Sequence, residues 1–261
     1  MRLPPIVSPG STAFPEPLAR AIYTPTPRSS FGAFRLFGGA EPPTLTLMQQ
    51  VAVAVVERIV DGRYAAASPL SEHALAAEFG VSKAPVSEAL LWVEAIGLLT
   101  NASRRSAQVA PMSRADYSDL IHYWDLLLPA ALAGFIGRHG PDEAAILRRY
   151  GDELDTLAGD DQRTFAFNEI VNRSILYAAL HSGLSRIGRA LCLLSLQVLR
   201  YNNLAFHSAP ARNALLREWH RVHDRIERRD EAGTRAVLDE LRVRRLEFAA
   251  AAFEAQAAGA S

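Results

Sequence analysis

The second half of the chain repeats apolar residues at helical spacing and never alternates them as a strand would, and this pattern limits the fold more than any other feature. Six helices are expected, and breakers such as Gly140-Pro141 and Ser182-Gly183 separate one from the next. The expected ranges are 114–138, 142–158, 162–181, 184–206, 211–229 and 231–256. Because each helix must bury its apolar stripe against another, the pattern predicts a mostly α fold with a six-helix bundle over residues 114–261.

Residues 46–113 predict a different unit, which begins with two helices. The first has apolar residues four apart over residues 47–59 and stops at Gly62. Ser71 fits the N-cap of a shorter second helix. That helix is expected to end at Gly80, because glycine suits the left-handed position that follows a helix.

A third helix and a short hairpin follow. Ser82 can cap the third helix, and Pro85 is tolerated in its first turn. After Gly97, two strand-like stretches flank a polar, basic tip at residues 101–106. Three helices, a tight glycine turn between the second and third, and a basic hairpin together predict a winged helix-turn-helix over residues 46–113.

Residues 1–45 are expected to be a disordered tail, because prolines interrupt every possible helix there. Glycine and serine fill the spaces between the prolines, and such a composition buries too little apolar surface to fold alone. The one apolar cluster, residues 31–37, could dock on the folded part, but we interpret it as part of the tail.

Composition excludes several classes of protein. With 28 basic and 28 acidic side chains the net charge is zero, so no global positive field attracts nucleic acid. The chain lacks an uninterrupted apolar run of about 18 residues and a signal peptide, so we expect neither a membrane span nor export. Its one cysteine, Cys192, fits the reducing cytosol, and we expect a cytoplasmic protein. The sequence contains no nucleophile elbow and no Walker motif, so we expect no enzyme activity.

Four motifs in the first half carry a resemblance to a known family. They are SEHALA at 71–76, GVSKAPVSEAL at 80–90, EAIGLL at 94–99 and RRSAQVAPMS at 104–113. In composition and spacing this winged domain resembles the GntR family of bacterial regulators, in the branch that has a helical FCD ligand domain. The second half resembles the FCD domain more loosely, at residues 116–129, 176–179 and 218–219.

The resemblance implies a ligand-responsive, DNA-binding transcription regulator that controls a metabolic operon. The implied partners are a double-stranded DNA operator and a small-molecule effector, which we expect to be a small organic acid. A homodimer is also implied, because the family reads two half-sites by two-fold symmetry.

The expected DNA contacts lie at the starts of the second and third helices and on the hairpin tip. A helix in the major groove needs small or polar residues at its N-terminal end, where base edges and phosphates lie. Arginines on the tip can enter the neighbouring minor groove, where the potential is negative. The expected DNA-binding residues are Ser71, His73, Ser82, Lys83, Ala84, Ser87, Arg104 and Arg105.

Three departures from the family pattern leave a second hypothesis open. The family usually has Arg where this chain has Lys83 and Ser87, and Gly where it has Ser106. Ser87 thus lacks the two hydrogen bonds that an arginine can donate to guanine. Residues 46–113 carry five basic and six acidic side chains, a net charge of −1. The alternative is a regulator-derived helical protein that has lost specific DNA binding and acts through protein contacts.

Many FCD domains hold a divalent metal ion with one Asp and three His, and this chain lacks those histidines. Depending on register, the first His position holds Asn168, Asn172, Arg173 or Leu176. Trp219 stands at the second position and Leu241 near the third. Without imidazole donors a transition-metal site loses most of its affinity, so we expect no metal and no other cofactor.

Direct hydrogen bonds and stacking are then expected to hold the effector. Amide and guanidinium groups can bind an acid without a metal ion, and an indole can form a wall of the pocket. The expected ligand-binding residues are Asn168, Asn172, Arg173, Trp219 and His223. His220 and His223 are three apart on one helix, a spacing that leaves a metal site as the alternative.

Overall fold

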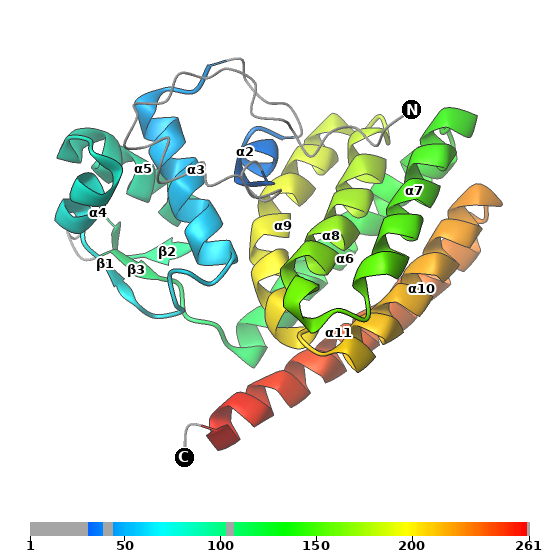
Figure 1. The fold of residues 1–261 in the computed structure, drawn as a ribbon. Coiled ribbons are helices and arrows are strands. Elements are labelled where there is room, and N and C mark those ends of the chain that lie inside the picture. Colours follow the sequence, from blue (N-terminus) through cyan, green and yellow to red (C-terminus); the bar gives the residue numbers. More distant parts are fainter. Residues whose placement is uncertain (1–30, 39–43, 103–106, 260–261) are drawn as a thin grey trace. The chain divides into compact units, whose positions relative to one another are not determined.

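The computed structural model describes residues 31–38, 44–102 and 107–259, and Figure 1 shows its fold. The chain divides into two compact units, one that ends at Met112 and one that begins at Ser113. We call the first the winged unit and the second the helical bundle. Helices dominate both units, so the predicted mostly α fold is confirmed.

The winged unit has three core helices, α3 (Leu47–Val60), α4 (Glu72–Phe79) and α5 (Lys83–Ala95), and a three-stranded antiparallel sheet. The middle strand, β3 (Ala107–Val109), lies between β1 (Pro69–Leu70) and β2 (Leu99–Thr100). Leu70 lies opposite Ala107, and Leu99 lies opposite Val109. The sequence predicted the hairpin of β2 and β3 but not β1, because two residues are too few to show an alternation.

Local sequence determines where these helices begin and end. Thr46 and Gln49 form a capping box at the start of α3, in which each side chain accepts a hydrogen bond from the other's backbone N–H. The Ser71 side chain accepts a hydrogen bond of 3.4 Å from the backbone N–H of Ala74 at the start of α4. Gly80 ends α4 in the left-handed conformation, with a φ of 65°. The glycine turn between α4 and α5 is therefore present as predicted.

The expectation of a disordered tail through residue 45 is wrong for its apolar cluster. A short helix, α2 (Phe31–Leu36), packs against α3. Its side chains Phe31 and Leu36 are buried, and this burial offsets the entropy lost when the segment becomes ordered. The surrounding prolines suggested a tail because composition alone does not show that a surface on α3 is ready to receive the cluster. Residues 1–30 and 39–43, the rest of the predicted tail, lie outside the described residues.

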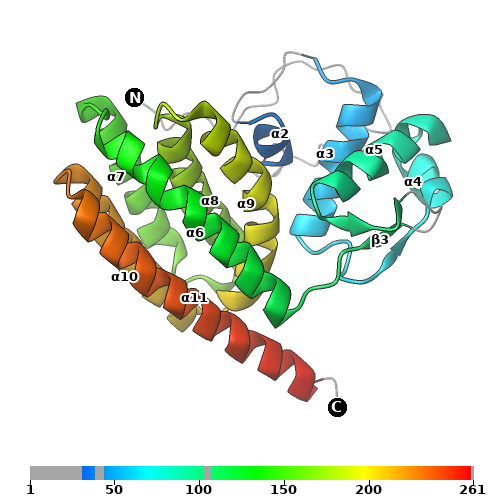
Figure 2. The ribbon, with the colours of Figure 1, turned by 180° about the vertical axis from the view of Figure 1, so that it is seen from behind.

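The helical bundle contains the six expected helices. They are α6 (Arg114–Ile136), α7 (Pro141–Leu157), α8 (Thr164–Leu180), α9 (Ser185–Ala205), α10 (Ala209–Glu227) and α11 (Glu231–Gly259), and a 3-10 turn, η2 (Asp161–Arg163), precedes α8. α6, α8 and α9 pack against one another, and α11 packs against α6, α9 and α10. Figure 2 shows α11 running beside α6. The interior between α6, α8, α9 and α11 is therefore the core of the bundle.

α6 differs from the other bundle helices in composition. Its length and its composition would both allow it to cross a membrane. A search for an uninterrupted apolar run does not detect this, because polar residues interrupt the helix. Only 44% of its most apolar stretch is buried in the protein. Core helices of bundles pass the same test, so composition does not assign α6 to a membrane. Its outer face exposes Tyr123 and Leu126, with exposed fractions of 49% and 65%.

Candidate DNA-binding surface and ligand site

The N-terminal end of α5 turns small and polar side chains outward. Ser82, Lys83 and Ala84 are exposed, and Ser87 is half-buried. Val86 and Leu90, on the opposite face of the helix, are fully buried in the core of the winged unit. Packing of the apolar face thus presents this end of α5 to solvent, as a helix that enters the major groove requires.

The same end of α5 suits a phosphate oxygen. Ser82 occupies the N-cap of α5, yet its side chain makes no capping hydrogen bond. The first N–H groups of a helix have no acceptor within the helix, so an anion is favoured there. Ser71 and His73 are also exposed, at the start of α4. Arg104 and Arg105, on the hairpin tip, lie outside the described residues.

The five expected ligand residues separate into three places in the bundle. Asn168 and Asn172 lie in the interior, on the face of α8 that packs against α9. Arg173 pairs with Glu169 on its own helix, with 2.9 Å between Nη2 and Oε1, and both side chains are buried. Trp219 and His223 lie on α10. The structure therefore does not bring all five together into one pocket.

Asn168 and Asn172 are fully buried and only partly hydrogen-bonded. Asn168 Nδ2 donates to the backbone oxygen of Asn202 at 3.2 Å and to Asn203 Oδ1 at 3.1 Å. Asn172 Nδ2 donates to the backbone oxygen of Asn168 at 3.0 Å. Both side-chain oxygens lack a donor among the described residues. Buried side-chain oxygens are usually paired, so these two could accept a hydrogen bond from a buried water or a bound molecule.

Three other buried side chains of the bundle have the opposite deficit, donors without acceptors. In the described part of the chain, no acceptor is found for Arg245 Nε and Nη2, Trp124 Nε1 or Asn202 Nδ2. All three are buried, and they come from α11, α6 and α9. We call Trp124, Asn168, Asn172, Asn202 and Arg245 the polar core. The positive charge of Arg245 acts on the Asp125 carboxylate, so the guanidinium has a countercharge. Its unbonded N–H groups and those of Trp124 and Asn202 could still donate to an acceptor-rich guest.

Tyr117 of α6 lies beside two members of the polar core, Asn202 and Arg245. Its hydroxyl donates to Asn202 Oδ1 at 3.3 Å. Burial raises the pKa of Tyr117 to about 12, and the nearby positive charge of Arg245 works against that rise. The phenol is therefore a neutral donor at ordinary pH, and it leaves Asn202 Nδ2 free to donate elsewhere.

Trp219 and His223 pack together at the edge of the core. The indole N–H of Trp219 donates to Ser174 Oγ of α8 at 2.8 Å, and the Trp219 side chain is buried. The His223 ring lies edge-on to that of Trp219, with 5.1 Å between centroids. Burial lowers the pKa of His223 to about 3, so its imidazole is neutral. Its Nε2 atom has no hydrogen-bond partner in the described ranges.

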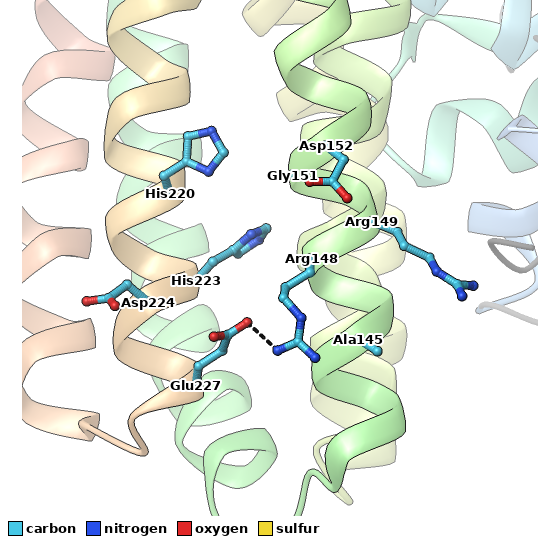
Figure 3. A pocket seen from close by; sticks show the side chains of 9 residues that line it. All are labelled: Ala145, Arg148, Arg149, Gly151, Asp152, His220, His223, Asp224 and Glu227. Atoms are coloured by element: carbon cyan, nitrogen blue, oxygen red, sulfur yellow. Dashed lines mark hydrogen bonds and ion pairs between the residues drawn. The ribbon is translucent and has the colours of Figure 1, made fainter. Parts of the chain in front are cut away.

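A groove of about 470 Å³ between α7 and α10 reaches His223 (Figure 3). Its other walls are largely charged, and an ion pair of 2.8 Å between Arg148 and Glu227 spans it. Trp219 does not line the groove, so the prediction that this indole forms a pocket wall finds no support there. Of the five expected ligand residues, His223 alone lines it.

The residues at the family's metal positions do not fit a metal ion. Asn168, Asn172, Trp219 and Leu241 are buried and supply neither imidazole nor carboxylate. Within the described residues, no three His, Cys, Asp or Glu side chains lie close enough together to hold a metal ion. His220, one member of the alternative pair, is instead bonded through Nε2 to Asp155 Oδ1 at 3.0 Å.

A winged helix-turn-helix with an exposed reading helix, followed by a helical bundle, defines the class of helix-turn-helix transcription regulators. The model of the bacterial regulatory proteins of the gntR family matches residues 47–109. The HTH-type transcriptional regulator BphR of Paraburkholderia xenovorans is 33% identical over 204 residues, which cover 72% of this chain and 81% of that protein. The chain therefore belongs to the GntR family of transcriptional regulators, whose members are not enzymes.

Further relatives agree with this assignment. A probable D-xylose utilization operon transcriptional repressor of Paenarthrobacter nicotinovorans is 28% identical and covers 59% of this chain and 69% of its own length. The solved structure of McbR/YncC from E. coli has a TM-score of 0.68 at 18% identity and covers 80% of this chain and 99% of its own. A GntR regulator structure from Rhodococcus sp. RHA1 has a TM-score of 0.65 at 16% identity, and it covers 77% of this chain and 97% of its own. At such identities the two structures show a shared fold and no more.

Sequence reasoning missed Arg245, Trp124 and Asn202. A weak signal was available for Arg245, which follows the buried Leu241 by four residues and so shares its inward face. Other arginines lie nearby on α11, and composition does not separate the inward one from the outward ones. Nothing in the sequence singles out Trp124 or Asn202, because only the packing of the helices shows that their donors are buried without acceptors.

Proposed function

We propose that this regulator binds the operator of a metabolic operon as a homodimer and responds to a small organic acid. The winged helix-turn-helix, residues 46–113, would contact DNA, and residues 114–261 would bind the effector and dimerise. The proposed DNA contacts are Ser71, His73, Ser82, Lys83, Ala84, Ser87, Arg104 and Arg105. The observation that carries the proposal is the exposed start of α5, where Lys83 stands beside unpaired helix amides.

Salt dependence tests the DNA contacts. Each phosphate contact that is lost reduces the slope of log affinity against log salt by about one. We expect Lys83→Ala to weaken operator binding about tenfold and to reduce the slope by about one, and Arg104→Ala with Arg105→Ala to reduce it by about two. Arg189→Ala, at an exposed position of the bundle, is the matched control. Unchanged affinity in both α5 and hairpin variants would favour the alternative, a protein that acts through protein contacts.

The polar core supports an effector that carries a carboxylate. Arg245 and Trp124 offer buried N–H donors that the described residues leave without acceptors. A carboxylate accepts several hydrogen bonds at once and would pair with the N–H groups of Arg245 that lack acceptors. The unpaired oxygens of Asn168 and Asn172 would accept from a hydroxyl group of the same molecule. These features together favour a small hydroxy acid or sugar acid.

A thermal-shift screen tests this effector site. Aliphatic, aromatic and sugar acids are compared with their amides, and we expect an acid, but not its amide, to raise the melting temperature. Arg245→Met should abolish this response. It should also lower the stability of the unliganded protein, because it removes the positive charge that acts on the Asp125 carboxylate. Arg235→Met, at an exposed site on the same helix, should keep the response. A response that persists in Arg245→Met would exclude the polar core as the site.

The outer faces of α6 and α11 support the homodimer. Val243 of α11 is 51% exposed, and Tyr123 and Leu126 of α6 are 49% and 65% exposed. Large apolar side chains that gather on neighbouring helices commonly mark a contact surface. Light scattering at tens of micromolar should give twice the chain mass of 28.5 kDa. A mass of one chain would exclude the dimer.

A further inference from the structure

α2 lies outside the family match, which begins at Leu47, and yet it is among the best buried parts of the winged unit. Phe31 is 1% exposed and Arg35 is fully buried. Arg35 Nη1 donates to the backbone oxygen of Phe31 at 3.2 Å, within the same helix turn. A six-residue helix is too short to be stable alone, so contacts with the rest of the protein must maintain it.

The contact with α3 requires glycine at position 32. The backbone N–H of Gly32 donates to Glu57 Oε1 at 3.3 Å. A Cβ atom at Gly32 would lie 2.9 Å from Glu57 Cγ and 3.5 Å from the backbone oxygen of Val53. Glu57 is itself only 3% exposed, so its side chain has little room to move away. Gly32 therefore permits a close approach of α2 to α3 that any larger residue would prevent.

A second contact reaches α5, the helix expected to read DNA. Phe37, directly after α2, has its ring centroid 5.9 Å from that of Trp92, at an interplanar angle of 51°. Aromatic pairs at this separation add to the stabilisation that burial alone provides. The segment thus touches two of the three core helices of the winged unit.

We propose that residues 31–37 form a strap helix, an added element that docks on α3 and α5, stabilises the winged unit and is released when Glu57 ionises. The strap helix fits the surface of α3 and α5 because it is short and apolar and has glycine, Gly32, at its second position. The Glu57 side chain of α3 faces the strap helix, where a neutral carboxyl accepts the Gly32 hydrogen bond without burying a charge.

The charges around Glu57 are mixed. The Gly32 N–H of the strap helix, Arg63 and Arg58 lower the pKa of Glu57, and Asp61 raises it. Burial is the largest effect and raises the pKa of Glu57 well above its usual value. Departure of the strap helix would expose part of this carboxyl to water and lower its pKa, so the docked state binds the proton more tightly. Docking is consequently favoured at low pH and weakened as the pH rises through the raised pKa.

Limited proteolysis with trypsin measures docking directly, because Arg35 is fully buried when the strap helix is docked. Mass spectrometry follows cleavage after Arg35 in the full-length protein. Gly32→Leu should raise the rate of this cleavage at least about tenfold, since cleavage tracks the population of the open form. Gly159→Leu, at a glycine whose added Cβ would meet no atom within 4 Å, should leave it unchanged. Equal rates in Gly32→Leu and the wild type would overturn the proposal.

Glu57→Gln separates ionisation from packing. The amide oxygen still accepts from Gly32 N–H, but the side chain cannot ionise. As the pH is raised across the range in which trypsin is active, we expect cleavage after Arg35 to accelerate in the wild type and to stay slow in Glu57→Gln, once both are corrected for trypsin activity on a reference peptide. Parallel pH profiles would overturn the role of Glu57. Circular dichroism at each pH checks that the remaining helices persist, so that loss of the whole unit is not taken for release of the strap helix.

Discussion

Arg58 on α3 forms an ion pair with Glu78 on α4, with 3.0 Å between Arg58 Nε and Glu78 Oε1. The guanidinium carbon of Arg58 lies 4.8 Å from the ring centroid of Phe79. The hydroxyl of Tyr64 donates to the second carboxylate oxygen of Glu78 at 2.9 Å. Because Arg58 is buried, these contacts fix α4, and with it the turn before α5, against α3.

Removal of the Glu78 carboxylate should weaken the winged unit. Glu78→Ala leaves Arg58 buried without its main partner, and we expect the free energy of unfolding to fall by about 1–3 kcal/mol. Urea unfolding followed by circular dichroism measures this change. The exposed pair Arg148–Glu227 offers the control, and Glu227→Ala should cost less than about 0.5 kcal/mol. Equal costs at the two positions would contradict a special role for the buried pair.

Arg212 should be the most sensitive arginine of the helical bundle. It is fully buried, and its guanidinium donates four hydrogen bonds. The acceptors are Ala158 O at 3.0 Å, Thr164 Oγ1 at 2.7 Å, His207 O at 2.6 Å and Asp161 Oδ1 at 2.6 Å. These bonds join the end of α7, the turn before α8 and the end of α9 to α10.

Arg212→Leu should lower the free energy of unfolding by about 3–5 kcal/mol, because it strands buried carbonyl groups. Arg212→Lys should restore only part of this loss, since one ammonium group cannot reproduce the planar fork of donors. Chemical denaturation of both variants gives the values. Arg217→Leu, at an exposed position of α10, should stay within about 0.5 kcal/mol of the wild type. A small effect of Arg212→Leu would show that the four bonds contribute little net stability.

His223 should make the helical bundle less stable in acid. The unfolded imidazole takes up a proton near pH 6.5, whereas burial lowers the pKa of His223 in the folded protein to about 3. Between these values the unfolded state binds a proton that the folded state does not, so stability falls as the pH falls. At pH 4.5 the loss should be about 2–3 kcal/mol relative to neutral pH.

His223→Leu removes this difference, and its unfolding free energy should change less between pH 7 and pH 4.5 than that of the wild type. Urea unfolding at the two pH values, followed by tryptophan fluorescence, tests the expectation. His220→Gln changes an exposed histidine one turn away and should keep the acid sensitivity of the wild type. The same pH dependence in His223→Leu and the wild type would show that other groups cause the loss.

The protein should purify without stoichiometric zinc, nickel or manganese, and a chelator should leave its melting temperature unchanged. The reason is that the family's metal positions hold Asn168, Asn172, Trp219 and Leu241, which lack strong transition-metal donors. Elemental analysis checks the metal content. About one transition metal per chain, lost on His223→Ala, would instead assign a metal site to His220 and His223.

The helices of the bundle could be predicted from the sequence because their signals are local. Ser113 caps α6 through a hydrogen bond of 3.1 Å from the backbone N–H of Asp116, and Pro141 begins α7. Apolar residues three and four apart then decide which face turns inward. The same local logic predicted the glycine turn between α4 and α5.

The candidate ligand site could be predicted only in part. Asn168 and Asn172 are one turn apart on α8, so their shared inward face follows from helical spacing. Arg173, one residue further, is rotated to another face and pairs with Glu169. Sequence spacing suggested that neighbours in the chain share a site, but the rotation of about 100° per residue separated them.

The sequence by itself determined the secondary structure, the winged helix-turn-helix motif and the exposed residues at the start of α5, since caps, glycine turns and apolar spacing act within a few residues. Tertiary structure alone decided that Phe31 and Gly32 pack on α3, against what the surrounding prolines suggest. It also decided that Tyr117 bonds Asn202 and lies near Arg245. The physical reason is that these contacts depend on how helices far apart in the sequence rotate and pack against one another, and no local pattern encodes that packing.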